Sequence, residues 1–193
     1  MHFFPMLYNL ENKRVLLVGG GAIARHKLEK LLDFTESIVV VAKDLSDEMA
    51  ALCQSYNLST TLKPYESGDL AGFDIVIGAV DDLGLQKQIF EEARQAGVLC
   101  NCVDATEYCD FIFPSYFKRN ELVVAVSSSG VTPSLAKGLR EHFESLIPDE
   151  IDDFIETVST IRNTMPKGPE RQKQLIALSR EFLKKHFSHS AKS

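Results

Sequence analysis

The 193-residue sequence lacks an apolar run long enough to cross a bilayer, so we expect no membrane association. Its first residues, Met1-His2-Phe3-Phe4-Pro5, lack the basic region and long apolar segment of a secretory signal, which predicts a cytoplasmic location. Lysine and arginine number 21 against 27 aspartates and glutamates, and the net charge is −6. Because no basic stretch interleaves with aromatic residues, nucleic acid is not an expected partner.

Metal-binding patterns are also missing. His186 and His189 are three residues apart but lie in a polar tail. The cysteines show neither a CxxC pair nor zinc-knuckle spacing, and reduced core thiols are the preferred interpretation for Cys53, Cys100, Cys102 and Cys109. The sequence therefore predicts no resident metal.

The sequence does contain an apolar run that ends in glycines. Val15-Leu16-Leu17-Val18 predicts a buried parallel strand, and apolar residues from Ala24 to Leu32 then recur at helical spacing. Between them lies Gly19-x-Gly21-x-x-Ala24, the pattern of a dinucleotide-binding turn. The first glycine makes the turn, the second lets backbone approach a pyrophosphate, and the small third residue lets helix and strand pack closely. The helix start then attracts the phosphates. A purely structural turn is the alternative.

Further strands and helices alternate along the first half of the chain. Strands are predicted at 37–42, 58–62, 74–82 and 98–104, and helices near 47–55 and 85–96, with Gly97 ending the latter. This order predicts an α/β fold with a doubly wound parallel sheet over residues 13–110. Residues 3–12 are expected to pack beside the first strand. The strand at 74–82 contains small residues near its end, Gly78 and Ala79 before Asp81, which suits a cofactor lying there.

The end of the second strand decides how a dinucleotide ribose is bound. Val41 occupies the usual place of the acidic residue, and Asp44 follows three residues later beside Lys43. Asp44 either reaches the ribose or helps to begin the helix at 47–55. Lys43 suits an extra phosphate, so these residues alone leave NAD and NADP open.

The pattern changes after residue 110. Segments 111–117 and 121–127 flank the turn 118–120 and predict an antiparallel hairpin, while Thr132 and Pro133 predict the cap and first residue of a helix reaching 146. Two more helices are expected at 149–164 and 169–187. A hairpin with few helices buries little area, so we expect this part to pack on another copy of the chain. The predicted regions are 1–112, 113–147 and 148–193.

Asp104 is the candidate catalytic carboxylate, because it stands at the end of the last predicted parallel strand. An aspartate with a reference pKa of about 3.9 is ionised at neutral pH and suits a general base, although a helix or turn cap is equally open. The serine-rich loop around Ser128 offers an anion-binding corner or ordinary turn chemistry. Positive charges that can collect acidic groups, or form a solvated face, are Lys118, Arg119, Lys137 and Arg140.

Taken in order, these motifs resemble one family. They are Phe4-Pro5, Gly19-Gly20-Gly21-x-x-Ala24-x-x-Lys27, Ala79-x-Asp81-Asp82, Asn101-x-Val103-Asp104, Phe111-Ile112-Phe113-Pro114-Ser115, Val124-Ala125-Val126-Ser127-Ser128-x-Gly130-x-x-Pro133-x-Leu135-Ala136 and Leu139-Arg140. Together they resemble the precorrin-2 dehydrogenase/sirohydrochlorin ferrochelatase module of sirohaem synthesis.

The resemblance implies an NAD-binding Rossmann domain, a dimerisation hairpin and a helical C-terminal region. It implies NAD-dependent oxidation of precorrin-2 to sirohydrochlorin, often followed by insertion of ferrous iron, with Asp104 serving both steps. Cofactor contacts carry over to Gly19, Gly21, Ala22, Ile23, Lys43, Asp44, Ala79 and Asp81, and substrate contacts are sought at Ser128 and the four basic residues. The family forms homodimers. A dehydrogenase without chelatase activity, one acting on another acidic small molecule, and a non-catalytic NAD sensor remain alternatives.

Overall fold

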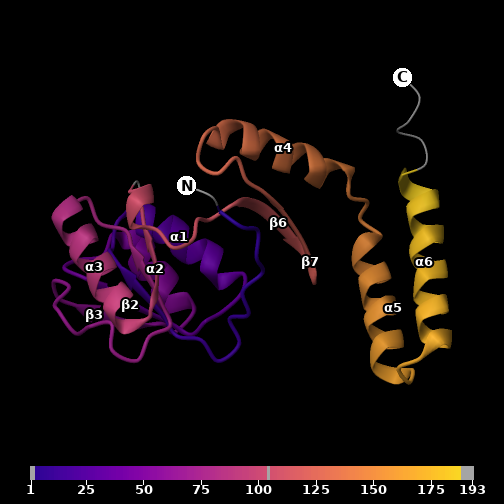
Figure 1. The fold of residues 1–193 in the computed structure, drawn as a ribbon, viewed down its shortest axis with the longest axis horizontal. Coiled ribbons are helices and arrows are strands. Elements are labelled where there is room, and N and C mark those ends of the chain that lie inside the picture. Colours follow the sequence, from indigo (N-terminus) through magenta and orange to yellow (C-terminus); the bar gives the residue numbers. More distant parts are fainter. Residues whose placement is uncertain (1–2, 104, 188–193) are drawn as a thin grey trace. The chain divides into compact units, whose positions relative to one another are not determined.

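The computed structural model describes residues 3–103 and 105–187, and the chain forms two compact units, Met1–Phe113 and Pro114–Ser193 (Figure 1). The first unit alternates strands and helices, as the sequence predicts. Its elements are β1 (Val15–Val18), α1 (Ala22–Leu32), β2 (Ile38–Ala42), α2 (Asp47–Ser55), β3 (Ser59–Leu62), β4 (Ile75–Gly78), α3 (Leu83–Ala96), β5 (Leu99–Cys102) and the short 3-10 helix η1 (Thr106–Tyr108).

The five strands of the first unit form one parallel sheet in the order β3-β2-β1-β4-β5. From β1 the chain builds outward to β3, and it then returns to the other side of β1 with β4. The strand order therefore reverses between β1 and β4, which is where a crevice opens at the carboxyl ends of such sheets. The predicted doubly wound fold is confirmed.

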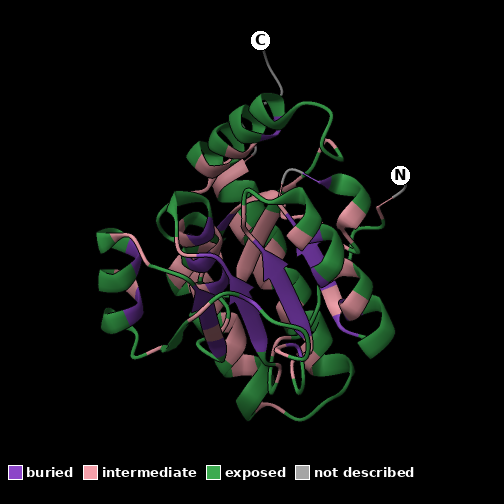
Figure 2. Cartoon of the chain, turned by 90° about the vertical axis from the view of Figure 1, so that its left-hand side faces the viewer, coloured by how far each residue is buried: buried purple, intermediate pink, exposed green. Residues whose placement is uncertain are grey.

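Alternate residues of β1 face the two sides of the sheet. Leu16 and Val18 belong to the apolar cluster that includes Ile89 of α3, whereas Val15 and Leu17 belong to the cluster under α1 and α2. Figure 2 shows the buried strands between the more exposed helices. Each fully buried Leu or Val contributes about 1.5–3 kcal/mol relative to an exposed one, so the central strands are firmly fixed.

The N-terminal segment is largely outside this core. Phe4 and Met6 are exposed, and Leu7 is 89% exposed, whereas Leu10 packs against the cluster under α1 and α2. The expectation that residues 3–12 pack beside the first strand is therefore wrong for most of the segment. The reason is topological: β1 is paired with β2 on one side and β4 on the other, so it has no free edge.

The second unit begins with an antiparallel hairpin of β6 (Ser115–Arg119) and β7 (Leu122–Val126). Arg119 is paired with Leu122, so the loop is Asn120-Glu121, and the positive φ of 49° at Asn120 suits this tight turn. The predicted hairpin is present, but its predicted turn at 118–120 is wrong. Lys118 and Arg119 are strand residues.

The predicted start of the hairpin at Phe111 is also too early. Phe111 and Phe113 pack against the core of the first unit, with their ring centroids 5.8 Å apart. The ammonium of Lys27 lies 4.3 Å from the centroid of the Phe113 ring. The aromatic residues that suggested a strand therefore complete the first core instead.

Three helices follow the hairpin: α4 (Pro133–Leu146), α5 (Ile151–Thr164) and α6 (Pro169–Phe187). Helix α4 packs on both hairpin strands, and α5 packs along α6 with the rings of Phe154 and Phe182 stacked at 4.4 Å. Pro133 is the first residue of α4, as predicted, but the Thr132 side chain makes no capping hydrogen bond. Among residues 3–103 and 105–187, no helix has the combined length and apolarity needed to cross a membrane.

Candidate functional site

The glycine loop after β1 lies between the loops that follow β2 and β4. Gly19 has a φ of 130°, and a Cβ there would lie 2.2 Å from the carbonyl oxygen of Ala79. A Cβ on Gly20 would lie 2.0 Å from the carbonyl oxygen of Asp44. Two glycines are therefore required by close backbone packing, before any ligand is considered.

Gly21 differs from its neighbours because it is exposed and a Cβ there would meet nothing within 4 Å. It is the N-cap residue of α1, no side chain caps this helix, and no acidic residue lies in the first turn. Uncapped N–H groups beside open space suit a pyrophosphate. Ala22 and Ile23 are also exposed there, so these residues fit a dinucleotide.

The small third residue of the fingerprint acts as expected. Ala24 is fully buried, and a Cβ on Gly19 would lie 3.4 Å from the Ala24 Cβ. Any larger side chain at position 24 would push α1 away from β1. Strand, turn and helix are thus fixed in the geometry that the fingerprint requires.

The loop after β2 resolves one of the open alternatives. Ser46 is the N-cap of α2, and its Oγ accepts a hydrogen bond from the Met49 N–H at 3.2 Å. The Ser46 N–H donates to the carbonyl oxygen of Gly20 at 2.9 Å. Asp44 is therefore not the cap of this helix. Lys43 and Asp44 are both exposed, in the loop that contacts the glycine turn.

The loop after β4 lies on the other side of the glycine turn from the loop after β2. Ala79 is half-buried, its N–H donates to the Val18 carbonyl at 2.8 Å, and Asp81 is exposed. Asp82 caps α3 by accepting hydrogen bonds from the N–H groups of the next turn. Leu83, at the start of α3, is 64% exposed.

Asp104, the predicted catalytic residue, lies outside the described residues. The residues on either side of it are well connected. The Val103 N–H donates to the Gly78 carbonyl at 2.9 Å. The Cys109 thiol donates to the Cys102 carbonyl at 3.1 Å and the Ala105 carbonyl at 3.4 Å. The described part of this loop therefore folds back onto the end of β5.

The cysteines behave as core thiols. Cys53, Cys100 and Cys102 are buried, and Cys109 is half-buried. Burial raises the pKa of the Cys109 thiol to about 11, so the nucleophilic thiolate is disfavoured at neutral pH. No group of three or more His, Cys, Asp or Glu side chains suited to a metal ion occurs in the part of the chain that the structure describes.

The predicted substrate residues lie in the second unit. The Ser128 Oγ accepts a hydrogen bond from the Thr132 N–H at 2.9 Å, so this hydroxyl stabilises the turn before α4. Arg119 pairs with Asp152 at 2.8 Å. On α4, Lys137 lies 4.0 Å from Glu141, and Arg140 pairs with Glu141 and Glu144. Lys118 is exposed on β6. Arg119, Lys137 and Arg140 therefore have carboxylate partners within this unit.

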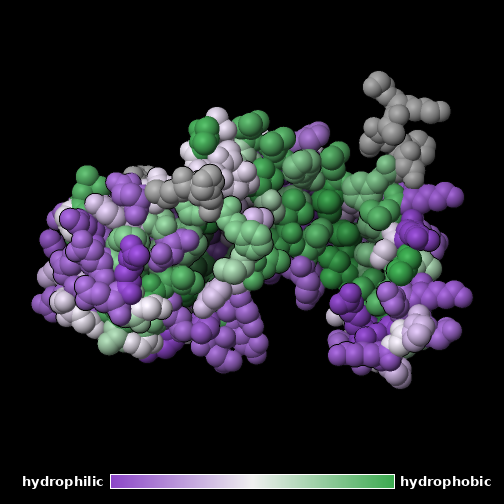
Figure 3. Space-filling model, in the orientation of Figure 1, coloured by the Kyte–Doolittle hydropathy of each residue, from purple (hydrophilic) through white to green (hydrophobic). Residues whose placement is uncertain are grey.

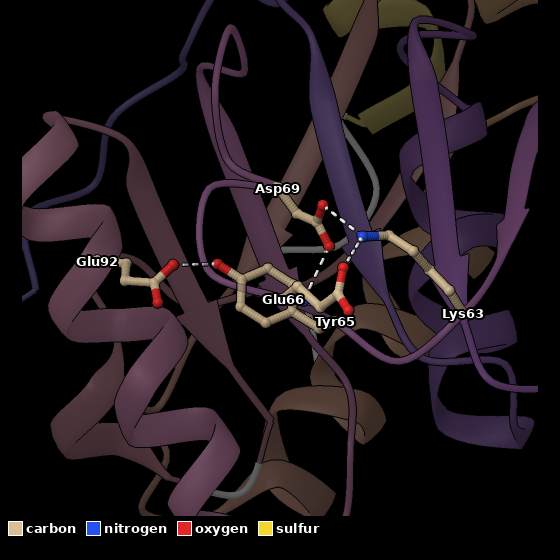
Figure 4. A network of polar contacts seen from close by, with 5 residues as sticks. All are labelled: Lys63, Tyr65, Glu66, Asp69 and Glu92. Carbon is tan, nitrogen blue, oxygen red and sulfur yellow. Dashed lines mark hydrogen bonds and ion pairs between the residues drawn. The ribbon is translucent and has the colours of Figure 1, made fainter.

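A network of polar contacts orders the loop after β3 (Figure 4). The Lys63 ammonium lies 2.8 Å from carboxylate oxygens of both Glu66 and Asp69. The buried Tyr65 donates its hydroxyl to Glu92 of α3 at 2.7 Å. Because every charged group in the network has an opposite charge or a donor beside it, its role is to fix this loop on α3.

Comparison with known proteins agrees with this geometry. A family model described as "Putative NAD(P)-binding" matches residues 6–115, which is more than half of the chain. The chain belongs to this family. Its sequence is 34% identical over 188 residues to siroheme synthase from Neisseria meningitidis serogroup C, covering 97% of this chain and 38% of that protein. It is 39% identical over 163 residues to siroheme synthase 1 from Cronobacter sakazakii, covering 84% and 35%.

A solved structure of similar fold is SirC, precorrin-2 dehydrogenase. The two match with a TM-score of 0.78 and 21% identity, over 97% of this chain and 100% of that one. This likeness shows a shared fold. The family model and the siroheme synthase relatives confirm the family resemblance predicted from the motifs. This chain spans little more than a third of the siroheme synthases it matches.

Proposed function

We propose that this protein oxidises precorrin-2 to sirohydrochlorin with NAD as the hydride acceptor. The observation that carries the proposal is the glycine turn at the point where the strand order reverses between β1 and β4: Gly21 borders open space there, and the N-terminus of α1 is uncapped. The relatives named siroheme synthase and the similarly folded precorrin-2 dehydrogenase support this choice of reaction.

The cofactor would lie across the glycine turn. The N–H groups of Ala22 and Ile23 would donate to the pyrophosphate, and Gly21 would leave room for it. Asp44 would accept hydrogen bonds from the adenosine ribose, which favours NAD because a 2′-phosphate would be repelled. Ala79 and Asp81 would line the other side of the crevice. Bound NAD supplies an acceptor for one hydride.

Asp104 would act as the general base. As the substrate loses a hydride to NAD, the Asp104 carboxylate would take the proton that the substrate also loses. The substrate is thereby oxidised by two electrons and loses two hydrogens. In a second step, ferrous iron enters sirohydrochlorin as a substrate while two pyrrole N–H protons leave. The same carboxylate, after losing its first proton to solvent, would accept one of them, and water would accept the other. Neither step needs a resident metal.

The substrate carries many carboxylates, which an overall acidic protein must attract locally. Ser128, Lys118, Arg119, Lys137 and Arg140 are the proposed contacts. Because Arg140 already pairs with Glu141 and Glu144, a substrate carboxylate there would have to replace one of these partners. Lys137 lies 4.0 Å from Glu141, at the limit of an ion pair, so a substrate carboxylate replaces this partner more easily.

The protein would act as a homodimer. Exposed apolar side chains recur along one face of α4, beside the row that contains the buried Ala136: Leu135, Leu139, Phe143 and Leu146. Figure 3 shows apolar side chains gathered over the hairpin and α4. A second copy of this chain would cover them.

Substitution of Asp104 tests the catalytic role. Asp104→Asn is expected to bind NADH as the wild type does and to lose precorrin-2 turnover. An unchanged rate would exclude Asp104 as the base. If the wild-type protein binds NADH but oxidises no tetrapyrrole, the proposed enzymatic function is wrong and the alternative of a non-catalytic NAD sensor replaces it.

A further inference from the structure

Two side-chain amides are buried among the described residues. Gln86 is 3% exposed and Asn101 is 4% exposed. Gln86 lies in the first turns of α3, in the row of buried residues that continues with Ile89 and Ala93. Asn101 lies in β5 between two buried cysteines. Both positions would ordinarily hold apolar residues.

Each amide donates one short hydrogen bond to the backbone of a loop at the carboxyl edge of the sheet. The Gln86 Nε2 donates to the Val80 carbonyl at 2.6 Å, in the loop after β4 that contains Asp81. The Asn101 Nδ2 donates to the Phe111 carbonyl at 2.8 Å, at the far end of the loop after β5. It also lies 3.4 Å from the Cys109 Sγ.

Each amide also leaves its oxygen without a hydrogen-bond partner among the described residues. The assignment of nitrogen and oxygen is clear, because a backbone carbonyl only accepts and must face the NH₂ group. A buried, unsatisfied oxygen costs about 1–3 kcal/mol, and a leucine of similar volume would avoid this cost. Packing of the core alone therefore does not account for the amides.

What the amides provide is a fixed carbonyl in each loop. In the loop after β5, two further hydrogen bonds accompany the one to Phe111. The Asp110 N–H donates to the Cys100 carbonyl at 2.8 Å, and the Cys100 N–H donates to the Asp110 carboxylate at 2.9 Å. These bonds close the loop at its far end. Asp110 and Phe111, at the far end of the loop that contains position 104, are thereby fixed relative to β5.

We propose that Gln86 and Asn101 are positioning residues for two separate parts of the reaction site: Gln86 sets the loop that receives the cofactor, and Asn101 sets the loop that carries the catalytic base. The proposal rests on the function proposed above. It predicts that removal of the Gln86 amide weakens cofactor binding, whereas removal of the Asn101 amide slows catalysis.

The experiment compares Gln86→Leu and Asn101→Leu with the wild type. Gln88→Leu is the matched control, since Gln88 is an exposed amide on the same helix, and its side chain donates to Glu92 at 3.0 Å. Gln86→Leu is expected to raise the Kd for NADH, measured by fluorescence, about tenfold, with the kinetic effect falling on KM for NAD. Asn101→Leu is expected to lower kcat about 100-fold with an unchanged NADH Kd. Gln88→Leu should change neither.

Asn101→Asp supplies a second, independent readout. A buried carboxyl group facing a carbonyl takes up a proton more readily, and its protonated form can donate to Phe111. The kcat of this variant relative to wild type is therefore expected to recover as the pH falls, which an effect on packing alone would not produce. A constant ratio across pH would overturn the role of Asn101.

Hydrogen exchange of the protein without ligands distinguishes failure of this proposal from failure of the proposed function. Asn101→Leu should speed exchange of the Asp110 N–H and leave that of the Ala79 N–H unchanged, while Gln86→Leu should do the reverse. Unchanged exchange in both loops, or equal losses of kcat and NADH affinity in both variants, would overturn the positioning roles. If these exchange changes occur but the wild type oxidises no precorrin-2, only the proposed reaction fails.

Discussion

The carbonyl oxygen of Asp44 lies 2.0 Å from the point where a Cβ on Gly20 would stand. The middle glycine of Gly19-Gly20-Gly21 is thus required by its contact with the loop after β2. Gly21, one residue later, has no such neighbour. Gly20 is therefore required by the fold, whereas the proposed need for glycine at position 21 comes from the cofactor.

Alanine substitutions test this separation. Gly20→Ala is expected to lower the free energy of unfolding by about 1–3 kcal/mol, because the loop after β2 must move to admit the methyl group. Gly21→Ala is expected to leave the unfolding midpoint unchanged, since its φ of −90° suits alanine, and to weaken NADH binding by placing a methyl group near the pyrophosphate. Denaturant unfolding and NADH titration of both variants measure the difference. Equal NADH affinity for wild type and Gly21→Ala would place the pyrophosphate elsewhere.

Stability at acidic pH should depend on Glu92. Burial acts to raise the pKa of its carboxyl group, but hydrogen bonds from Tyr65, Gln88 and Ser67 outweigh burial and leave the pKa below its usual 4.5. A depressed pKa stabilises the folded protein above pH 4.5, and this stabilisation is lost as pH falls through the folded-state value. Glu92→Gln is expected to make unfolding less sensitive to pH below 5. Parallel curves for variant and wild type would contradict this.

Arg119 is expected to contribute to the stability of the second unit as well as to substrate binding. Its guanidinium contacts Asp152, which also accepts from the Asn120 side chain at 3.2 Å. Arg119→Gln and Asp152→Asn should lower the unfolding midpoint by similar amounts, and the double variant should lower it little further, because both changes break one contact. Only Arg119→Gln should raise the substrate KM. Additive shifts in the midpoint would show that the pair is not coupled.

The apolar face of α4 should control assembly. Phe143→Glu is expected to raise the dimer dissociation constant by at least about tenfold, because a charge would be buried in the interface. Ser145→Glu, an exposed position on the same helix, is the control. Light scattering after size exclusion measures the mass of each variant. An undisturbed dimer in Phe143→Glu would exclude this face.

Most of the first unit was predictable because β1, β2 and β4 are short apolar runs, each followed by a helical pattern. Gly97 illustrates this, since its left-handed φ of 71° ends α3 where the sequence places the helix end. The hairpin start was not predictable, because aromatic residues such as Phe111 favour strands and core packing equally. The exposure of Leu7 depends on β1 being paired on both sides, which is a property of the sheet and not of the segment.

At the site, the fingerprint predicted Gly19, Gly21 and Ala24 because each of these positions requires a small residue for a local reason: the turn, the approach of a pyrophosphate, and the close packing of helix on strand. The side chain of Ser46 was missed, although a serine before Asp47 and Glu48 is an ordinary helix cap. Gln86 and Asn101 were assigned no role for a different reason. Their signal is a polar residue in a row of buried positions, and burial is known only once the strands and helices have been assembled.

The most direct test of the account is an anaerobic assay of the purified protein with enzymatically generated precorrin-2 and NAD, followed by addition of ferrous iron. The account predicts NADH and sirohydrochlorin in equal amounts, and then sirohaem faster than without enzyme. Oxidation without faster iron insertion would leave a dehydrogenase alone. Absence of any precorrin-2 oxidation, with NADH binding intact, would contradict the central claim.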